Sequence, residues 1–130
     1  TYHYIGLFYF KKGEYNEAIR YLKEAIEISE RYGDYSEGGM AMLSLAMVYL
    51  TIKDYENAEY YLSDGLKRFQ KVGEKHGEGM ALAFFGLYFR DKGDLQSARE
   101  YLRKAYEIFR SIGAEEEAED VLIELAEIEE

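Results

Sequence analysis

The apolar residues of this chain are gathered in runs that recur along its length. The run at residues 39–52, GMAMLSLAMVYLTI, holds one serine, one threonine and no charged residue, and it is too short to cross a bilayer. A helix that is apolar on every side must be covered on every side, so this run predicts a buried helix. Similar runs lie at residues 2–10 and 79–89. The chain is therefore organised around repeated copies of one helix.

Between these runs lie segments whose apolar residues follow a helical spacing. The clearest stripe consists of Tyr15, Ala18, Ile19, Leu22, Ala25, Ile26 and Ser29. Charged residues occupy the opposite face, which is typical of a helix that covers a core on one side. Two kinds of helix therefore alternate. First helices are predicted at residues 2–12, 35–52, 75–92 and 115–129, and second helices at 15–31, 55–71 and 95–111.

Glycine and aspartate mark the predicted helix ends. Gly33, Gly73 and Gly113 follow the second helices, at the position where a left-handed residue commonly ends a helix. Asp54 and Asp94 stand just before second helices, so we expect their carboxylates to accept the free amides of the first turn.

Similar residues recur at a spacing of 40 positions. The recurring sets are Gly6/Ala46/Gly86, Ala18/Ala58/Ala98, Leu22/Leu62/Leu102, Gly33/Gly73/Gly113 and Tyr9/Tyr49/Phe89. A fixed period of this length indicates a solenoid, in which each unit buries its apolar face against its neighbours. The small residues on both kinds of helix would let paired helices approach closely.

These sets resemble the tetratricopeptide repeat. The family's aromatic-x2-Leu-Gly-x2-Tyr motif corresponds to Tyr2-x2-Ile5-Gly6-x2-Tyr9, and further copies begin at Met42 and Leu82. The alanine of the family's following Ala-x3-aromatic motif is present in each copy, with leucine in place of the aromatic residue. The repeat is longer than the usual 34 residues, and glycine replaces the closing proline.

The resemblance implies an all-α, right-handed α-α superhelix that forms a single domain over residues 1–130. Its parts would be three helical hairpins, at roughly 1–33, 34–73 and 74–113, and a capping helix at 114–130. By the repeat pattern, Thr1 falls inside the first helix of a unit, and the sequence does not begin with methionine. We therefore expect the chain to be part of a larger protein. In the last helix, Val121, Leu122, Leu125 and Ile128 are expected to face residues 95–111, with an acidic outer face as the solubilising cap.

Charge is unevenly distributed along the chain. The formal net charge is −10, and residues 113–130 hold nine of the 26 acidic residues and no basic one. No basic stripe of the kind that binds nucleic acid is visible. The absence of cysteine excludes disulfides and thiolate metal sites. We find no signal-peptide pattern and no apolar span of about 20 residues, so we expect a cytoplasmic location and no membrane partner.

No residue pattern indicates catalysis. His3 and His76 are far apart in the repeat, and His76 is expected to lie in a solvated turn. Ser44 has no histidine or lysine at a spacing that sequence alone can read. The glycines at 73–79 suggest a phosphate loop, but no strand precedes them and a similar set occurs 40 residues earlier. The acidic residues at 115–124 are expected to form a solvated helix face. We therefore expect no enzyme activity, no cofactor and no metal.

In a stack of this kind, the resemblance implies that the first helices line a concave groove. The residues expected to bind a partner there are Tyr4, Leu7, Phe10, Met40, Leu43, Met47, Leu50, Met80, Phe84, Leu87, Asp120 and Glu124. The groove would be apolar with one acidic end. Methionine is frequent on surfaces that accept varied apolar partners, and a solvated surface rarely gathers so many apolar side chains.

We therefore expect a protein–protein interaction scaffold. A partner peptide or amphipathic helix would lay its apolar side in the groove, with a basic residue toward Asp120 and Glu124. A clamp for a C-terminal carboxylate, as in chaperone adaptors, needs Lys, Arg and Asn where this chain has apolar residues. Three alternatives stay open: the apolar residues fill the groove themselves, the groove binds a second copy, or the domain senses a small ligand within a signalling or transcription protein.

Overall fold

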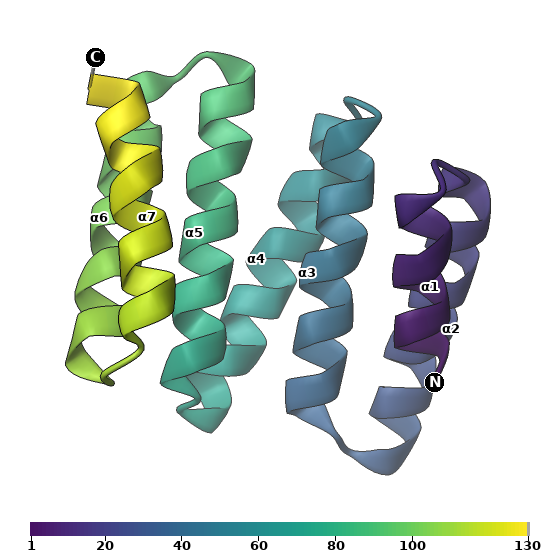
Figure 1. Cartoon of the computed structure of the whole chain (residues 1–130). Coiled ribbons are helices and arrows are strands. Elements are labelled where there is room, and N and C mark those ends of the chain that lie inside the picture. The colour runs from purple at the N-terminus through teal and green to yellow at the C-terminus, as the bar shows by residue number, and fades with distance from the viewer. Residues whose placement is uncertain (130) are drawn as a thin grey trace. The chain divides into compact units, whose positions relative to one another are not determined.

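The computed structural model describes residues 1–129, and over this range its regular elements are all α-helices (Figure 1). They are α1 (Tyr2–Lys11), α2 (Tyr15–Tyr32), α3 (Tyr35–Thr51), α4 (Tyr55–Val72), α5 (Lys75–Lys92), α6 (Leu95–Ser111) and α7 (Glu115–Glu129). Each predicted helix is present, and its ends lie within one residue of the prediction. Glu130, the last residue of the predicted capping segment, lies outside the described residues.

The helices form two compact units, Thr1–Val72 and Gly73–Glu130. In the first unit α1 packs on α2, α2 on α3 and α3 on α4, and α1 also contacts α3. In the second unit α6 packs on both α5 and α7. Consecutive helices within each unit run in opposite directions (Figure 1). The sequence repeat is therefore expressed as a succession of helical hairpins.

Small residues allow the paired helices to approach closely, as predicted. A methyl group placed on Gly6 would lie 2.7 Å from Cγ of Leu22, and one on Gly86 would lie 2.6 Å from Cγ of Leu102. Both leucines are buried in the core. Because these distances are below van der Waals contact, the first helix sits directly on the leucine of its partner helix.

Each hairpin also contains a stacked aromatic pair. The ring centroids of Tyr9 and Tyr21 lie 5.4 Å apart, and those of Phe89 and Tyr101 lie 5.3 Å apart. Tyr49 and Tyr61 form the equivalent pair at 5.8 Å. Such pairs add stabilisation beyond the burial of their area. They give the recurring aromatic of the first helix a specific partner on the second helix.

One predicted feature of the last helix is wrong. Val121 and Leu125 are buried where α7 packs on α6, but the side chain of Leu122 is 46% exposed. Leu122 follows Val121 by one position, which rotates it by about 100° around the helix axis and away from α6. The apolar stripe that covers α6 is therefore narrower than the sequence suggested.

Asp94 caps α6, as predicted. Its carboxylate accepts the Ser97 amide at 3.1 Å, and this bond lowers the pKa of Asp94 below its ordinary value of 3.8. We expect Asp94→Ala to lower the thermal midpoint of unfolding, with Asp94→Asn closer to wild type. The pKa of Asp94 is lower in the folded state than in the unfolded state. The stabilisation that the cap provides is therefore complete above pH 3.8 and is lost as the pH falls through the folded-state pKa. Thermal scans at pH 7 and below pH 3 test this, and a gap between wild type and Asp94→Ala that does not narrow in acid would contradict it.

Lys53 departs from the pattern of the other helix ends. It has a φ of 66°, whereas glycine holds the positive φ at positions 13, 33, 73, 93 and 113. A left-handed conformation costs a non-glycine residue about 1–2 kcal/mol. Lys53→Gly would relieve this cost, but glycine also increases the conformational entropy of the unfolded chain, which opposes the gain. We expect a net rise of about 1 kcal/mol in the free energy of unfolding. Urea denaturation measures the change. The control is the reverse substitution, Gly93→Lys, which should destabilise the chain. If Lys53→Gly is neutral or destabilising, the expectation is wrong.

Candidate partner-binding site

In the first unit, the predicted partner-binding residues differ in exposure. Tyr4 is exposed, and Leu7, Phe10, Met40 and Met47 are partly exposed. Leu43 and Leu50, by contrast, are buried. Leu43 is covered because Gly65 of α4 leaves room for it, so that a methyl group on Gly65 would lie 3.1 Å from Cδ2 of Leu43. The expectation that Leu43 and Leu50 offer surface to a partner is therefore corrected, because both belong to the packed interior.

In the second unit, the predicted residues meet at a cavity of about 190 Å³. We call it the α5–α7 cavity. Its lining is Met80, Ala83, Phe84 and Leu87 from α5, Leu102 and Phe109 from α6, and Glu117, Asp120, Val121 and Glu124 from α7. All five residues predicted for this unit lie in that set. The cavity has an apolar floor and α5 side, with carboxylates only on its α7 side.

Two of these carboxylates are bound to cationic or ionisable side chains of α5. Glu117 Oε2 lies 2.6 Å from Nε2 of His76, whose ring lies 5.8 Å from that of Phe109. This hydrogen bond lowers the pKa of Glu117. Glu124 accepts a hydrogen bond from Arg90, which also lies 3.9 Å from Glu127. The two pairs join α5 to α7 at either end of the cavity.

Asp120 lies between these two pairs. It is exposed and lines the cavity, yet it forms no hydrogen bond or ion pair with any residue in 1–129. The α5 side chains that share the cavity with it are apolar. The cavity therefore presents one carboxylate that residues 1–129 leave without a counterion.

The expectation that His76 lies in a turn is wrong, although its side chain is exposed, as expected. The helix α5 begins at Lys75, so His76 occupies its first turn and reaches α7. The pairing depends on how far one first helix is shifted along the next, and no local sequence signal shows that shift. In both units, the hydrogen-bonded residues of neighbouring first helices are 34 or 41 positions apart, a difference of about two helical turns.

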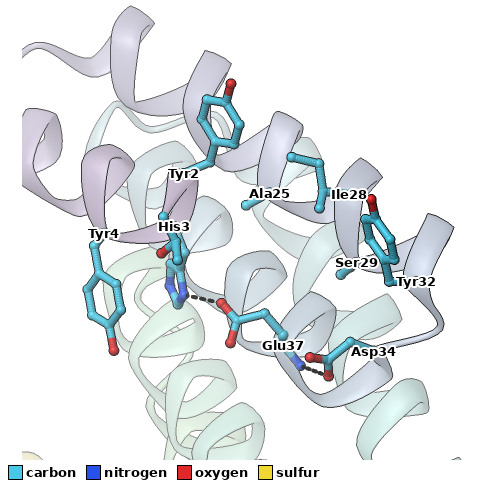
Figure 2. Close-up of a pocket in the computed structure, with 10 residues that line it drawn as sticks. Tyr2, His3, Tyr4, Ala25, Ile28, Ser29, Tyr32, Asp34 and Glu37 are labelled. Carbon is cyan, nitrogen blue, oxygen red and sulfur yellow. Dashed lines mark hydrogen bonds and ion pairs between the residues drawn. The ribbon is translucent and has the colours of Figure 1, made fainter.

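The structure also supplies Ser44 with a histidine that the sequence spacing did not show. Nε2 of His3 lies 3.0 Å from Oγ of Ser44, and its Nδ1 lies 3.1 Å from Oε1 of Glu37. Figure 2 shows His3 reaching from α1 toward Glu37 at the start of α3. This is the order of groups in a Ser–His–carboxylate relay.

Acyl transfer also requires an oxyanion hole, and within residues 1–129 the surroundings of Ser44 do not provide one. An oxyanion hole needs donors that are free to bind the developing charge, but Ser44 lies in the middle of α3, where the backbone amides are used by the helix. His3 is itself buried. The network therefore satisfies the buried polar atoms of His3 and fixes the register of α1 on α3.

A second cavity, of about 520 Å³, lies in the first unit beside this network (Figure 2). Its walls come from the start of α1, the end of α2 and the start of α3, and they include Tyr4, Tyr32 and Glu37. Among the predicted partner-binding residues, Tyr4 lines it. Within residues 1–129, no three side chains of His, Cys, Asp or Glu are grouped to hold a metal ion. No described helix is both long and apolar enough to cross a membrane.

The sequence matches a known repeat family over most of its length. A model of the tetratricopeptide repeat matches residues 1–71 and 39–111. A search of curated protein sequences found no significant match. The match includes the first two predicted hairpins and all but the last two residues of the third.

Solved structures agree with this assignment. BtubC (BKLC) from P. vanneervenii superimposes with a TM-score of 0.72 at 17% identity, over 98% of this chain and 61% of that one. The N-terminal domain of stress-induced protein-1 from C. elegans has a TM-score of 0.72 at 17% identity, over 99% and 92%. A signal transduction ATPase with numerous domains and a tetratricopeptide repeat sensor, from Pyrococcus horikoshii, has a TM-score of 0.60 at 21% identity, over 92% and 25%.

At these identities the structures show the fold alone, and this chain spans 61% of the length of BtubC. The fold is an all-α helical solenoid. Solenoids built from this repeat are protein–protein interaction modules and are typically not enzymes. With its family model matched across three hairpins and its helices in the expected order, the chain belongs to the tetratricopeptide repeat family.

Proposed function

We propose that the chain binds a peptide or an amphipathic helix of a partner protein on the accessible side of its first helices. We call this side the first-helix surface. The name applies to each unit by itself: the surface consists of Tyr4, Leu7, Phe10, Met40 and Met47 in the first unit, and of Met80, Phe84, Leu87, Asp120 and Glu124 in the second. The observation that carries the proposal is the α5–α7 cavity, an apolar recess in which all the predicted residues of its unit meet.

The residue types support an apolar ligand. Met80, Phe84 and Leu87 are one helical turn apart on α5 and remain partly exposed. Apolar side chains of a bound helix three and four residues apart would match that spacing. Met47 and Met80 add flexible side chains that adapt to partners of different shape.

The charges of the cavity indicate which partners are excluded. Glu117, Asp120 and Glu124 line it, and the lining contains no lysine, arginine or asparagine. A C-terminal carboxylate would be repelled there, because like charges brought together cost several kcal/mol, of the order usual at interfaces. The partner segment is therefore basic beside its apolar residues, and it differs from the acidic tails that a carboxylate clamp would take.

A pull-down from a lysate of the source organism tests the proposal. The bait proteins are the wild-type chain, Met47→Glu, Leu87→Glu and the double variant, after circular dichroism has shown that each is folded. Tyr60→Glu is the matched control, since Tyr60 is exposed on α4, a second helix. We expect a partner that wild type and Tyr60→Glu retain and that the first-helix variants lose. If all baits capture the same proteins, binding lies elsewhere and the proposal fails.

A second candidate function is favoured by the larger cavity. Its volume of about 520 Å³ is in the range of small-ligand sites, and the similar chain from Pyrococcus horikoshii carries its repeats as a sensor. In this alternative the chain would bind a small molecule and regulate another domain of a larger protein. A nucleotide-binding or helix-turn-helix domain next to it in the full-length sequence would favour the sensor, whereas a full-length protein made of repeats alone would remove the basis for it.

A further inference from the structure

We propose that the α5–α7 cavity is a subsite for a single lysine or arginine side chain of the partner, whose cationic group binds Asp120. This inference rests on the proposed function, because it assumes that a partner segment lies on the first-helix surface. It assigns to one cavity a ligand of stated chemistry, a long aliphatic stem that ends in a positive charge.

The first argument is the order of charged groups along the cavity. At one end His76 binds Glu117, and at the other Arg90 binds Glu124. Between them α7 offers Asp120, which has no partner among residues 1–129. The register of contacts between α5 and α7 places Asp120 opposite Ala83, at a spacing of 37 between the observed 34 and 41. The middle position thus has a carboxylate and lacks a cation, which a partner can supply.

The second argument is the size of the cavity. At about 190 Å³ it is smaller than the roughly 300–1,000 Å³ of sites for drug-sized ligands. It therefore suits one side chain better than a whole small molecule. Ala83 has the smallest side chain in the lining, and Leu102 and Phe109 of α6 form the floor.

The third argument is the distribution of polarity. The α5 side and the floor are apolar and the carboxylates stand along α7. Lysine and arginine are the side chains that bury an aliphatic stem against apolar surface while their charged end reaches a polar rim. A purely apolar side chain would fill the recess but would leave Asp120 without a counterion.

The fourth argument is the local field. The described residues of α7 include Glu115, Glu116, Glu117 and Glu119 beside Asp120, and no basic residue. This concentration of negative charge attracts a cation and repels an acidic side chain. It favours a basic residue at this subsite over any neutral or acidic one.

The probe for the test is a phage-displayed library of random 12-residue peptides, selected on the wild-type chain. We expect the enriched peptides to share a Lys or Arg with apolar residues three or four positions away. A synthetic peptide of the enriched sequence is then measured by fluorescence anisotropy. We expect Asp120→Asn to weaken binding about tenfold, the order usual for loss of one charge pair at an interface, and Ala83→Leu, which fills the recess, to weaken it as well.

Two controls separate the subsite from general electrostatics. Glu119→Gln removes one negative charge from the same helix at an exposed position that does not line the cavity. We expect it to change the affinity less than twofold, since a charge that does not contact the peptide acts on it only through screened solvent. Replacing the peptide's basic residue with methionine should weaken binding to wild type and leave binding to Asp120→Asn nearly unchanged. Asp120 is exposed, so its replacement should not alter the thermal midpoint.

The outcomes distinguish the subsite from the proposed function. Suppose that Leu87→Glu abolishes peptide binding, but the enriched peptides share no basic residue and bind Asp120→Asn as tightly as wild type. That result overturns the subsite and leaves the proposed function in place. If no peptide is enriched, or if the enriched peptides bind Leu87→Glu and Met47→Glu unchanged, then the proposed function fails and the subsite with it.

Discussion

Replacing Phe109 with alanine is expected to lower the free energy of unfolding by about 3–5 kcal/mol, the usual cost of removing a buried phenylalanine. Phe109 is 1% exposed, and its ring lies against the backbone of α5 at Gly79. Urea denaturation followed by circular dichroism measures the effect.

The matched control is Phe84→Ala. Phe84 is partly exposed on the first-helix surface, so the same deletion there leaves no closed cavity and should cost about 1 kcal/mol or less, in keeping with the small effects of surface positions. A loss below about 1 kcal/mol for Phe109→Ala would mean that α6 is not fixed to α5 through this ring, since full burial implies several kcal/mol.

Replacing Gly79 with leucine is expected to destabilise the chain by about 3 kcal/mol, at the upper end of the range for overpacked sites. A methyl group on Gly79 would lie 2.8, 3.0 and 3.1 Å from three atoms of the Phe109 ring. Phe109 is 1% exposed and packs against α5, so a leucine at position 79 can be accommodated only if the ring is displaced. Ala83→Leu is the control on the same helix, because Ala83 faces the open α5–α7 cavity.

The double variant Gly79→Leu/Phe109→Ala extends this prediction. If the leucine occupies the space that the ring leaves, the two costs will not add, and the coupling will exceed about 1 kcal/mol, as is usual for residues in direct contact. Urea midpoints for the four proteins give that coupling. Additive costs would show that the two residues do not share one packing site.

The helices could be predicted because their signals are local. The apolar stripe of α2 lies within that helix. The glycine after α2 and the aspartate before α6 each lie directly at the helix end that they cap. Because the repeat has a period of 40, a signal at one position predicted the same feature at the equivalent positions of the other copies. The bounds of the helices could therefore be predicted from several copies together. Asp34 was missed as a cap, although its carboxylate accepts the Glu37 amide at 3.1 Å.

The candidate site could be predicted only in part, because it depends on contacts between helices. The five residues of the second unit were found since they share one face of their helices and remain accessible. Leu43 shares such a face but is buried, because Gly65 lets α3 and α4 approach closely. That glycine corresponds to alanine at positions 25 and 105, so the repeat pattern gave no warning of it.

Pairings across neighbouring first helices were also beyond the repeat pattern. His3 with Ser44 and His76 with Glu117 are each 41 residues apart, and His3 with Glu37 is 34 apart. A period of 40 relates equivalent positions, whereas contacts depend on how far one helix is shifted along the next. That shift is set by tertiary packing, and a single sequence does not show it.

The central claim is that a partner binds the first-helix surface, and the four methionines of the chain allow it to be tested directly. Met40, Met47 and Met80 are partly exposed on that surface, whereas Met42 is 3% exposed in the core of the first unit. The measurement is NMR of the chain labelled with 13C at the methionine methyl groups, titrated with the peptide selected from the random library. We predict that partly exposed methionines shift on binding, either Met80 in the second unit or Met40 and Met47 in the first, and that Met42 stays in place. Binding that leaves Met80, Met47 and Met40 unchanged, or that shifts Met42 most, would contradict the account.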